Sequence, residues 1–321
     1  MAGERPPNSR SRVLVTGVSG LIGRHTARAL SMRGHAVLGV VRRSLSAAER
    51  VPGVQYVELG DIGPTTRWDE VLQNVDAIVH SAAHAHVMAP TALDELAYRR
   101  VNVEGTRALA IAARKAGVRR LLFVSSIKVN GEATPERAFT AEDTPAPRDA
   151  FGRCKLDGEQ AVREVLSTND WVIVRPPLVY GRGMRGNFAR MTQLVARGWP
   201  LPFGSIVNKR SFLGAENLAD LIVDALEHPR AVGRVWLASD GEDLSTPELV
   251  QAIAAAQSCA ARVWSCPVPL LRALGVVLGK GAEMRRLTDS LYVDATPARG
   301  ELGWQPRVRF AEGLSRALGL A

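Results

Sequence analysis

Three glycines near the start of the chain have a spacing that suits binding of a pyrophosphate. Gly17, Gly20 and Gly23 form a G-x-x-G-x-x-G pattern between the apolar run Val13–Thr16 and the helically periodic stretch Leu21–Met32. In such a strand–turn–helix unit the first glycine permits a tight turn and the second lets the backbone approach phosphate. The third lets the helix pack on the strand. The spacing differs from G-x-G-x-x-G, so a glycine-rich turn that binds nothing is the alternative.

A pair of arginines follows the next apolar run. Arg42 and Arg43 stand about twenty residues after the glycines, where an acidic residue would bond the ribose 2′-hydroxyl of NAD and an arginine would accommodate the 2′-phosphate of NADP. Two arginines and no acid favour NADP(H) over NAD as the cofactor. The alternative is a solvated pair of arginines at a strand end that binds nothing. Asp61 is a candidate for the adenine edge, or equally a helix cap.

These residues need a parallel sheet to hold them, and the N-terminal half predicts one. Strand-like runs alternate with helical ones, which indicates an α/β fold, a doubly wound Rossmann sheet covered on both faces. Ligands bind at the carboxyl ends of strands in such sheets. The predicted strands are Val13–Thr16, Ala36–Val41, Val54–Leu59, Ala77–Ser81, Arg120–Ser125 and Trp171–Val174. The predicted helices are Leu21–Met32, Trp68–Asn74, Leu93–Ala116 and about Phe151–Leu166.

The composition of the chain changes after about Pro176, where glycine and proline become frequent. Val235–Ala238 predicts one more strand of the sheet, and Ser245–Gln257 predicts a helix with Ser245 as its N-cap. We therefore expect a smaller C-terminal substrate lobe interleaved with the main domain. The expected boundaries are 1–180 for the Rossmann domain and 181–321 for the lobe, with about 205–240 returning to the Rossmann domain.

Charge and hydropathy exclude several other classes. The net charge of +9 is spread along the chain and aromatic residues make up only 5%, so we expect no nucleic-acid partner. The apolar stretch Val268–Leu278 is too short to span a bilayer and contains Arg272, which predicts a packed helix rather than a membrane contact. The polar, basic start of the chain, Met1–Arg12, predicts a frayed tail without a secretory signal.

Neither the cysteines nor the histidines have the spacing of a metal site. The three cysteines have no disulfide framework and fit a reducing cytoplasm; they are Cys154, Cys259 and Cys266. The clustered histidines His80, His84 and His86 lack an acidic or cysteine partner, so we expect no metal.

Several motifs, spread from residue 12 to the end, together resemble one family. They are Thr16-Gly17-Val18-Ser19-Gly20-Leu21-Ile22-Gly23, His80-Ser81-Ala82-Ala83, Asn102-Val103-Glu104-Gly105-Thr106, Phe123-Val124-Ser125-Ser126, Arg175-Pro176-Pro177-Leu178-Val179-Tyr180-Gly181 and Glu301-Leu302-Gly303-Trp304. The chain is similar to extended short-chain dehydrogenases/reductases of the NAD-dependent epimerase/dehydratase family. Within that family, residues 125–132 and 186–188 resemble bacterial enzymes of surface-polysaccharide (O-antigen) sugar synthesis.

The resemblance implies an active site with one departure from the family. The family has a Ser or Thr after the fifth strand, which aligns with Ser126, and a Tyr-x-x-x-Lys motif whose lysine aligns with Lys155. Phe151 stands where the tyrosine belongs. In the family the lysine binds the nicotinamide ribose and lowers the tyrosine pKa, so that the phenol can exchange a proton with the sugar. Phe151 has no proton to exchange, and losing a general acid/base typically costs ~10²–10⁴ in rate.

Four readings of Phe151 stay open. The residue is an engineered Tyr→Phe change, or a natural variant that uses Lys128 or a water as the donor, or the mark of a protein that binds without catalysing. The fourth is a core aromatic unrelated to the motif, which the matching Gly152 and Lys155 disfavour.

The resemblance also assigns binding residues. Those expected at the cofactor are Gly17, Ser19, Gly20, Leu21, Ile22, Gly23, Arg42, Arg43, Asp61, Ile62, Ser81, Ala82, Ala83, Asn102, Lys155 and Pro176. Those expected at a nucleotide-sugar are His84, Ser126, Ile127, Lys128, Phe151, Asn187, Arg210, Arg285 and Arg286. Arginines suit the diphosphate, because the guanidinium binds phosphate oxygens in a bidentate manner.

These features together predict a cytoplasmic enzyme, expected as a homodimer, that takes a UDP-linked sugar. Ile127 and Lys128 replace the Asp-Glu pair of the family's dehydratases, so dehydration is disfavoured. The leading hypothesis is NADPH-dependent reduction of the C4 ketone of a UDP-4-keto-6-deoxy-hexose. The alternatives are a UDP-hexose 4-epimerase with bound NAD and a catalytically silent NADP-binding regulatory protein.

Overall fold

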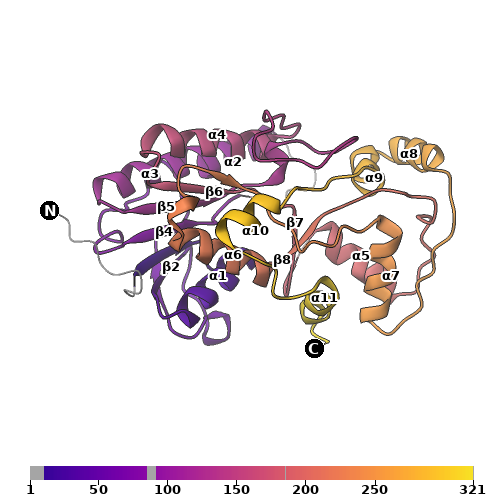
Figure 1. Cartoon of the computed structure of the whole chain (residues 1–321), viewed down its shortest axis with the longest axis horizontal. Helices are drawn as coiled ribbons and strands as arrows, with labels where there is room; N and C mark the ends of the chain where they lie inside the picture. The colour runs from indigo at the N-terminus through magenta and orange to yellow at the C-terminus, as the bar shows by residue number, and fades with distance from the viewer. Residues whose placement is uncertain (1–10, 85–91, 185, 321) are drawn as a thin grey trace.

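The computed structural model describes residues 11–84, 92–184 and 186–320. Its centre is a seven-stranded parallel sheet in the order β3-β2-β1-β4-β5-β6-β9 (Figure 1). The strands are β1 Arg12–Thr16, β2 Ala36–Val41, β3 Val54–Glu58, β4 Ala77–His80, β5 Arg120–Val124, β6 Trp171–Val174 and β9 Val235–Trp236. The doubly wound α/β prediction is confirmed. Six predicted strands agree to within one residue at each end, and the last is two residues shorter than expected.

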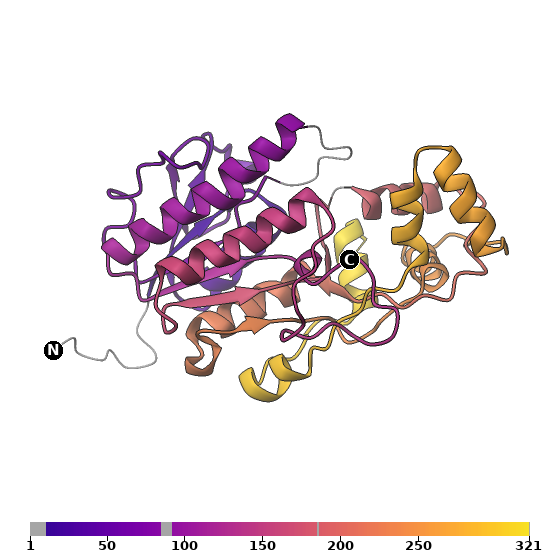
Figure 2. The same ribbon diagram turned by 90° about the horizontal axis from the view of Figure 1, so that it is seen from above.

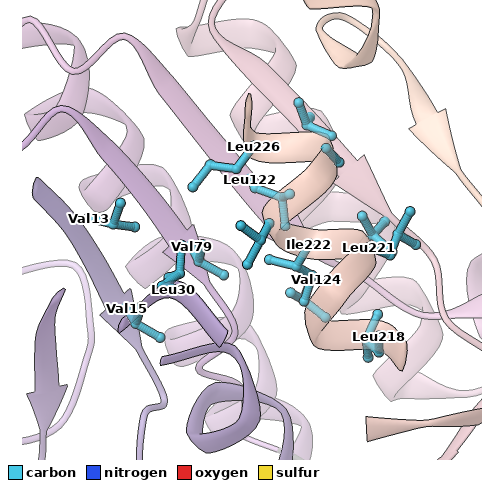
Figure 3. Close-up of a cluster of buried hydrophobic side chains, with 14 of the residues drawn as sticks. Val13, Val15, Leu30, Val79, Leu122, Val124, Leu218, Leu221, Ile222 and Leu226 are labelled. Atoms are coloured by element: carbon cyan, nitrogen blue, oxygen red, sulfur yellow. The ribbon is translucent and has the colours of Figure 1, made fainter. Parts of the chain in front are cut away.

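Helices cover both faces of this sheet, which is why its strands read as continuous apolar runs. The helices α1 (Leu21–Met32) and α6 (Ala215–Glu227) pack on one face. Figure 3 shows Ile222 and Leu226 of α6 beside Leu122 and Val124 of the sheet, and Val79 beside Leu30. The other face is covered by α3 (Thr106–Lys115) and α4 (Ala150–Val165).

The helix predicted over Trp68–Asn74 is wrong. The segment forms a series of hydrogen-bonded turns, in which Val71 and Leu72 donate to the Trp68 carbonyl. Asn74 has a left-handed backbone with φ 57°, which ends any helical run before β4. The apolar spacing resembles a helix because Trp68 and Leu72 are both buried against the sheet.

The helix predicted over Leu93–Ala116 is present, but it contains an irregular centre. A π-helical segment, Arg99–Gly105 (η2), separates α2 (Ala92–Tyr98) from α3. The segment approaches α4 so closely that a Cβ on Gly158 would lie 2.6 Å from the Asn102 carbonyl oxygen. This close approach holds Asn102, one of the predicted cofactor residues, against α4.

The C-terminal lobe is built around its own apolar cluster. It lies beyond one end of the sheet (Figure 2). Its elements are β7 Leu178–Tyr180 paired in parallel with β8 Phe212–Gly214, α5 Asn187–Ala196, α7 Thr246–Ala256, α8 Val268–Val277, α9 Gly281–Thr288 and α11 Phe310–Leu318. One more helix, α10 (Thr296–Leu302), returns to the α6 side of the sheet through Ala298 and Trp304. Short 3-10 turns lie at Ala47–Glu49 (η1), Ile127–Val129 (η3) and Pro229–Ala231 (η4).

The stretch Val268–Leu278 is helical as expected, but the expectation that it is packed is wrong for one of its faces. Leu271 is buried against the lobe, whereas Leu270, Leu274 and Val277 are largely exposed. Within the described ranges, none of the helices has the length and apolar character needed to cross a membrane.

Candidate active site

The glycine turn after β1 has the geometry of an anion cradle. Gly17 has φ +69°, and a Cβ there would lie 2.7 Å from the Ala82 nitrogen, so only glycine fits. A Cβ on Gly23 would lie 2.2 Å from the Gly17 carbonyl oxygen, which packs α1 tightly on the turn. Gly20 is the N-cap of α1, with no side-chain cap and no acid in the first turn. The positive end of α1 therefore faces the turn without a competing carboxylate, which fits a dinucleotide pyrophosphate.

Ser19, Leu21 and Ile22 flank this cradle from the turn and the first turn of α1. On β4's side of the cradle, the Ser81 hydroxyl donates to the Thr16 carbonyl at 2.7 Å, and the exposed Ala83 follows Ala82. The structure therefore brings the motifs that follow β1 and β4 together at the carboxyl ends of these two neighbouring strands.

A buried polar chain fixes the end of β4. The Ala82 N–H donates to Thr16 Oγ1 at 3.2 Å, and Thr16 Oγ1 lies 2.7 Å from His80 Nδ1. His80 Nε2 lies 3.0 Å from Thr106 Oγ1, which donates to the Asn102 carbonyl. Burial lowers the pKa of His80 to about 3, so the ring is neutral and both of its nitrogens are used in structural bonds.

The Asn102 side chain holds the segment that follows β4. Its amide oxygen accepts from the His84 N–H at 2.8 Å, and its amide nitrogen donates to the His84 carbonyl at 3.0 Å. The His84 ring contacts Tyr98 edge-on, with 5.3 Å between ring centroids. His86 lies outside the described residues. Within those residues no cluster of His, Cys, Asp or Glu could hold a metal ion.

The arginines after β2 are engaged with carboxylates. Arg43 bonds Glu49 at 2.8 Å, and this bond lowers the pKa of Glu49 to about 2. Arg42 lies 3.7 Å from Asp61, both side chains being strongly exposed. A 2′-phosphate would therefore compete with Glu49 for Arg43. Glu49 was missed in the sequence because it follows the strand by several residues. Ile62 packs into the core beneath this edge.

The two serines after β5 have different surroundings. Ser125 Oγ donates to Glu159 at 2.5 Å, inside a buried network. Ser126 is the N-cap of η3, and its hydroxyl accepts from the Lys128 N–H at 3.3 Å. Ile127 is buried in an apolar cluster, and its N–H donates to the Pro176 carbonyl at 3.0 Å. Ser126 is therefore the serine left half-exposed at this strand end, while Ile127 packs away from it.

Lys155 lies under the same strand end. It is fully buried, its Nζ donates to the Val124 carbonyl at 2.6 Å, and its ammonium lies 4.0 Å from the centroid of the Phe123 ring. Burial lowers the pKa of Lys155 to about 7, although the nearby Glu159 carboxylate opposes this shift.

Phe151 lies one turn before Lys155 on α4. Its half-buried ring meets Tyr98 edge-on at 6.1 Å, and the Lys128 ammonium lies 6.0 Å from its centroid. The ring is thus held between an aromatic side chain and a cation.

A charged cluster joins the two lobes beside Phe151. Lys128 Nζ contacts Asp149, the N-cap of α4, and lies 3.6 Å from Glu132. Arg286 of α9 approaches Glu132 at 3.8 Å and Asp149 at 3.9 Å. Burial alone would raise the pKa of Asp149, but the Lys128 hydrogen bond and the Gly152 N–H bring it below its usual value. The sequence identified Lys128 and Arg286 but not their two acidic partners.

The other predicted phosphate contacts are spread over the lobe. Arg210 Nη1 donates to the carbonyls of Arg286 at 2.7 Å and Asp289 at 3.1 Å, so it caps the end of α9, and burial lowers its pKa to about 10. Asn187 is exposed at the start of α5, after Gly186 with φ +76°, and Arg285 is exposed on α9. Of the three lobe arginines, Arg286 lies in the charged cluster and Arg210 holds the carbonyl beside it.

The profile of the NAD dependent epimerase/dehydratase family matches residues 13–238. A UDP-glucose 4-epimerase of Vibrio cholerae is 39% identical over 312 residues, which cover 95% of this chain and 93% of that protein. A 2-alkyl-3-oxoalkanoate reductase of Stenotrophomonas maltophilia is 29% identical over 95% of this chain and 98% of its own length.

Among solved structures, MoeE5 in complex with UDP-glucose and NAD superposes with a TM-score of 0.76 at 24% identity, covering 96% of this chain and 98% of that one. This structural likeness shows the same fold. The family profile and the 39% identical relative go further and show the family. The chain therefore belongs to the NAD dependent epimerase/dehydratase family of extended short-chain dehydrogenases/reductases, a family of nicotinamide-dependent enzymes.

Proposed function

We propose that this enzyme interconverts the C4 hydroxyl and the C4 ketone of a UDP-hexose, and that it acts as a UDP-hexose 4-epimerase with bound NAD. The observation that carries the proposal is that Ser126 follows the carboxyl end of β5 while the Lys155 ammonium donates to the carbonyl of Val124, the last residue of that strand. The relative of 39% identity, whose name is UDP-glucose 4-epimerase, supports it over nearly the whole chain. We favour NAD over NADP as the cofactor because Arg43 is already paired with Glu49.

The chemistry divides between cofactor and protein. A bound nicotinamide would take hydride from C4 of the sugar and return it. The Ser126 hydroxyl would hydrogen-bond the C4 oxygen as its charge changes. The Lys155 ammonium would bind the nicotinamide ribose, which is the role of the corresponding lysine in the family.

One proton has to leave and return at the C4 oxygen, and Phe151 cannot carry it. Lys128 is the candidate, because its side chain lies beside the Phe151 ring. Its ammonium would pass one proton to its partner Asp149, and the neutral amine would then take the proton of the C4 hydroxyl and return it. A water between Lys128 and the C4 oxygen is the other route. The Lys128 route places the proton donor on η3 instead of on α4.

A second candidate is the NADPH-dependent 4-ketoreductase. It is favoured by Arg42 and Arg43, since β2 is followed by two arginines and no acid. We propose the cytoplasm as the compartment and a homodimer as the assembly in either case.

The deciding experiment separates these functions and a silent binding protein. The purified protein is denatured and the released dinucleotide is identified by chromatography. The native protein is then incubated with UDP-glucose, and UDP-galactose is followed by proton NMR. A parallel sample receives a UDP-4-keto-6-deoxy-hexose and NADPH.

UDP-galactose formed without net cofactor turnover supports the epimerase. Ketone-dependent oxidation of NADPH, with no epimerisation, replaces it by the reductase. If neither the native protein nor Phe151→Tyr turns over any of these sugars, both enzyme proposals fail and the binding-only protein remains.

A further inference from the structure

The outer face of α8 carries a row of exposed apolar side chains. Leu270, Leu274, Val277 and Leu278 are 59%, 51%, 82% and 61% exposed. Their spacing of i, i+4, i+7 and i+8 puts them on one helical face. The opposite face is the packed one: Leu271 is buried, and a Cβ on Gly275 would lie 2.8 Å from Met284 of α9. The helix is therefore apolar on both sides, and only one side is covered.

This face, which we call the α8 face (Leu270, Leu274, Val277 and Leu278), differs from the other exposed apolar side chains. Met32 and Leu96 are strongly exposed but lie on helices whose remaining outer positions are mostly polar or charged. Val276, at the end of α8, and Trp264, in the segment leading into it, are exposed as well. Contiguous apolar surface of this kind marks an interaction site in a globular protein.

The charge around the α8 face selects its partner. Over α8, α9 and the segment before them, five basic residues (Arg262, Arg272, Lys280, Arg285 and Arg286) face two acidic ones (Glu283 and Asp289), which leaves an excess of positive charge. Arg272 is held by Asp289 at 2.5 Å, whereas Lys280 is exposed at the end of the helix. The whole chain carries +9, which favours its approach to an anionic surface.

The position of α8 in the fold leaves its apolar face accessible to a binding partner. In Figures 1 and 2, α8 lies in the outer part of the C-terminal lobe, away from the seven-stranded sheet. Exposed leucine and valine side chains suit the acyl boundary of a bilayer, and the exposed Lys280 after the helix suits its anionic headgroups. We propose that the α8 face docks the enzyme reversibly on a bilayer surface that carries anionic headgroups.

The test is co-sedimentation of the purified full chain with vesicles of phosphatidylcholine and phosphatidylglycerol, and with phosphatidylcholine alone. The native protein should bind the mixed vesicles and lose most binding in high salt. Leu274→Glu with Val277→Glu should reduce the partition coefficient by about tenfold or more. Lys280→Gln should reduce it by about fivefold.

The matched control is Met32→Glu, which puts a carboxylate on an equally exposed apolar position remote from α8 and should bind vesicles like the native protein. Circular dichroism and thermal unfolding check that each variant is folded. The proposal is overturned if the native protein does not co-sediment with anionic vesicles, or if the α8 and Met32 variants lose vesicle binding equally. It is also overturned if the α8 substitutions abolish self-association measured by light scattering while vesicle binding stays unchanged, because the face then belongs to a second copy.

Discussion

Arg175 and Glu159 form a buried two-point ion pair beneath the active-site end of β5. Arg175 Nε donates to Glu159 Oε1 at 2.8 Å, and Nη2 donates to Oε2 at 2.7 Å. The same carboxylate accepts from Ser125, and Arg175 Nη1 donates to Asn130 at 3.0 Å. The pair therefore ties β5, η3, α4 and β6 together directly behind Ser126 and Lys155.

Breaking this pair should be costly. Glu159→Gln leaves the buried Arg175 charge without its anion, and we expect the free energy of unfolding to fall by about 3–5 kcal/mol. Urea denaturation measures it. The matched control is Glu301→Gln, which breaks the half-exposed bidentate pair with Arg234 and should lower the free energy of unfolding far less, because solvent screens that pair. Equal losses in the two variants would contradict the role of the buried pair.

Phe151→Tyr should raise kcat by ~10²-fold or more with little change in substrate affinity, because the phenol contributes when the proton moves. The ring already occupies the space between Tyr98 and Lys128, so the fold should tolerate the hydroxyl. Steady-state kinetics on UDP-glucose provides the measurement. If the native chain is already fast and the tyrosine adds nothing, Lys128→Ala should abolish turnover, and a fully active Lys128→Ala would leave water as the donor.

The ion pair of Arg43 with Glu49 should set the cofactor preference. NADH should bind at least as tightly as NADPH, and Glu49→Gln should improve NADPH binding severalfold, by releasing Arg43 for the 2′-phosphate. Fluorescence titration of both dinucleotides tests this. Arg43→Ala is the control, which should remove the gain when combined with Glu49→Gln. Tighter binding of NADPH by the native chain would refute the expected order.

Lys155 should give the protein a distinctive pH dependence of stability. Its folded pKa is about 7, below the ordinary value of 10.5, so between these two pH values the unfolded chain binds more protons than the folded one. Stability should therefore rise with pH across this window, and the Lys155 contribution should be flat below it. The difference in unfolding free energy between the native chain and Lys155→Met, measured from pH 7 to 10, isolates this effect from other titrating groups. A pH-independent difference would show that Lys155 titrates normally in the fold.

Arg210 should matter for stability as well as for binding. Arg210→Ala removes the charged donor from the carbonyls of Arg286 and Asp289, which should cost ~1.5–3 kcal/mol of unfolding free energy. The substitution should also weaken UDP binding, because Arg286 would lose the side chain that holds its carbonyl. Calorimetric titration with UDP measures this affinity. Arg285→Ala, on the exposed side of α9, is the control and should leave stability unchanged. Unchanged stability in Arg210→Ala would remove the capping role.

Local chemistry was enough to predict the frame of the molecule. The apolar runs of β1 and β5 are long and β-branched because both faces of a parallel sheet are buried, and this pattern is readable without any partner in view. The glycine turn after β1 is equally local, since Gly17 and Gly20 meet within four residues. Ser245 caps α7 with Glu248 as its reciprocal partner, three positions away.

The partners of the site side chains were decided only by the tertiary structure. Glu159 meets Arg175 from another element, Glu49 reaches back to Arg43 around a turn, and Arg210 caps a helix 76 residues further along the chain. A side chain's charge and type are properties of the sequence, but which group it faces depends on how distant elements pack. The same reason explains α8: its apolar composition predicts a helix, and only the packing of the lobe determines which of its two apolar faces is covered.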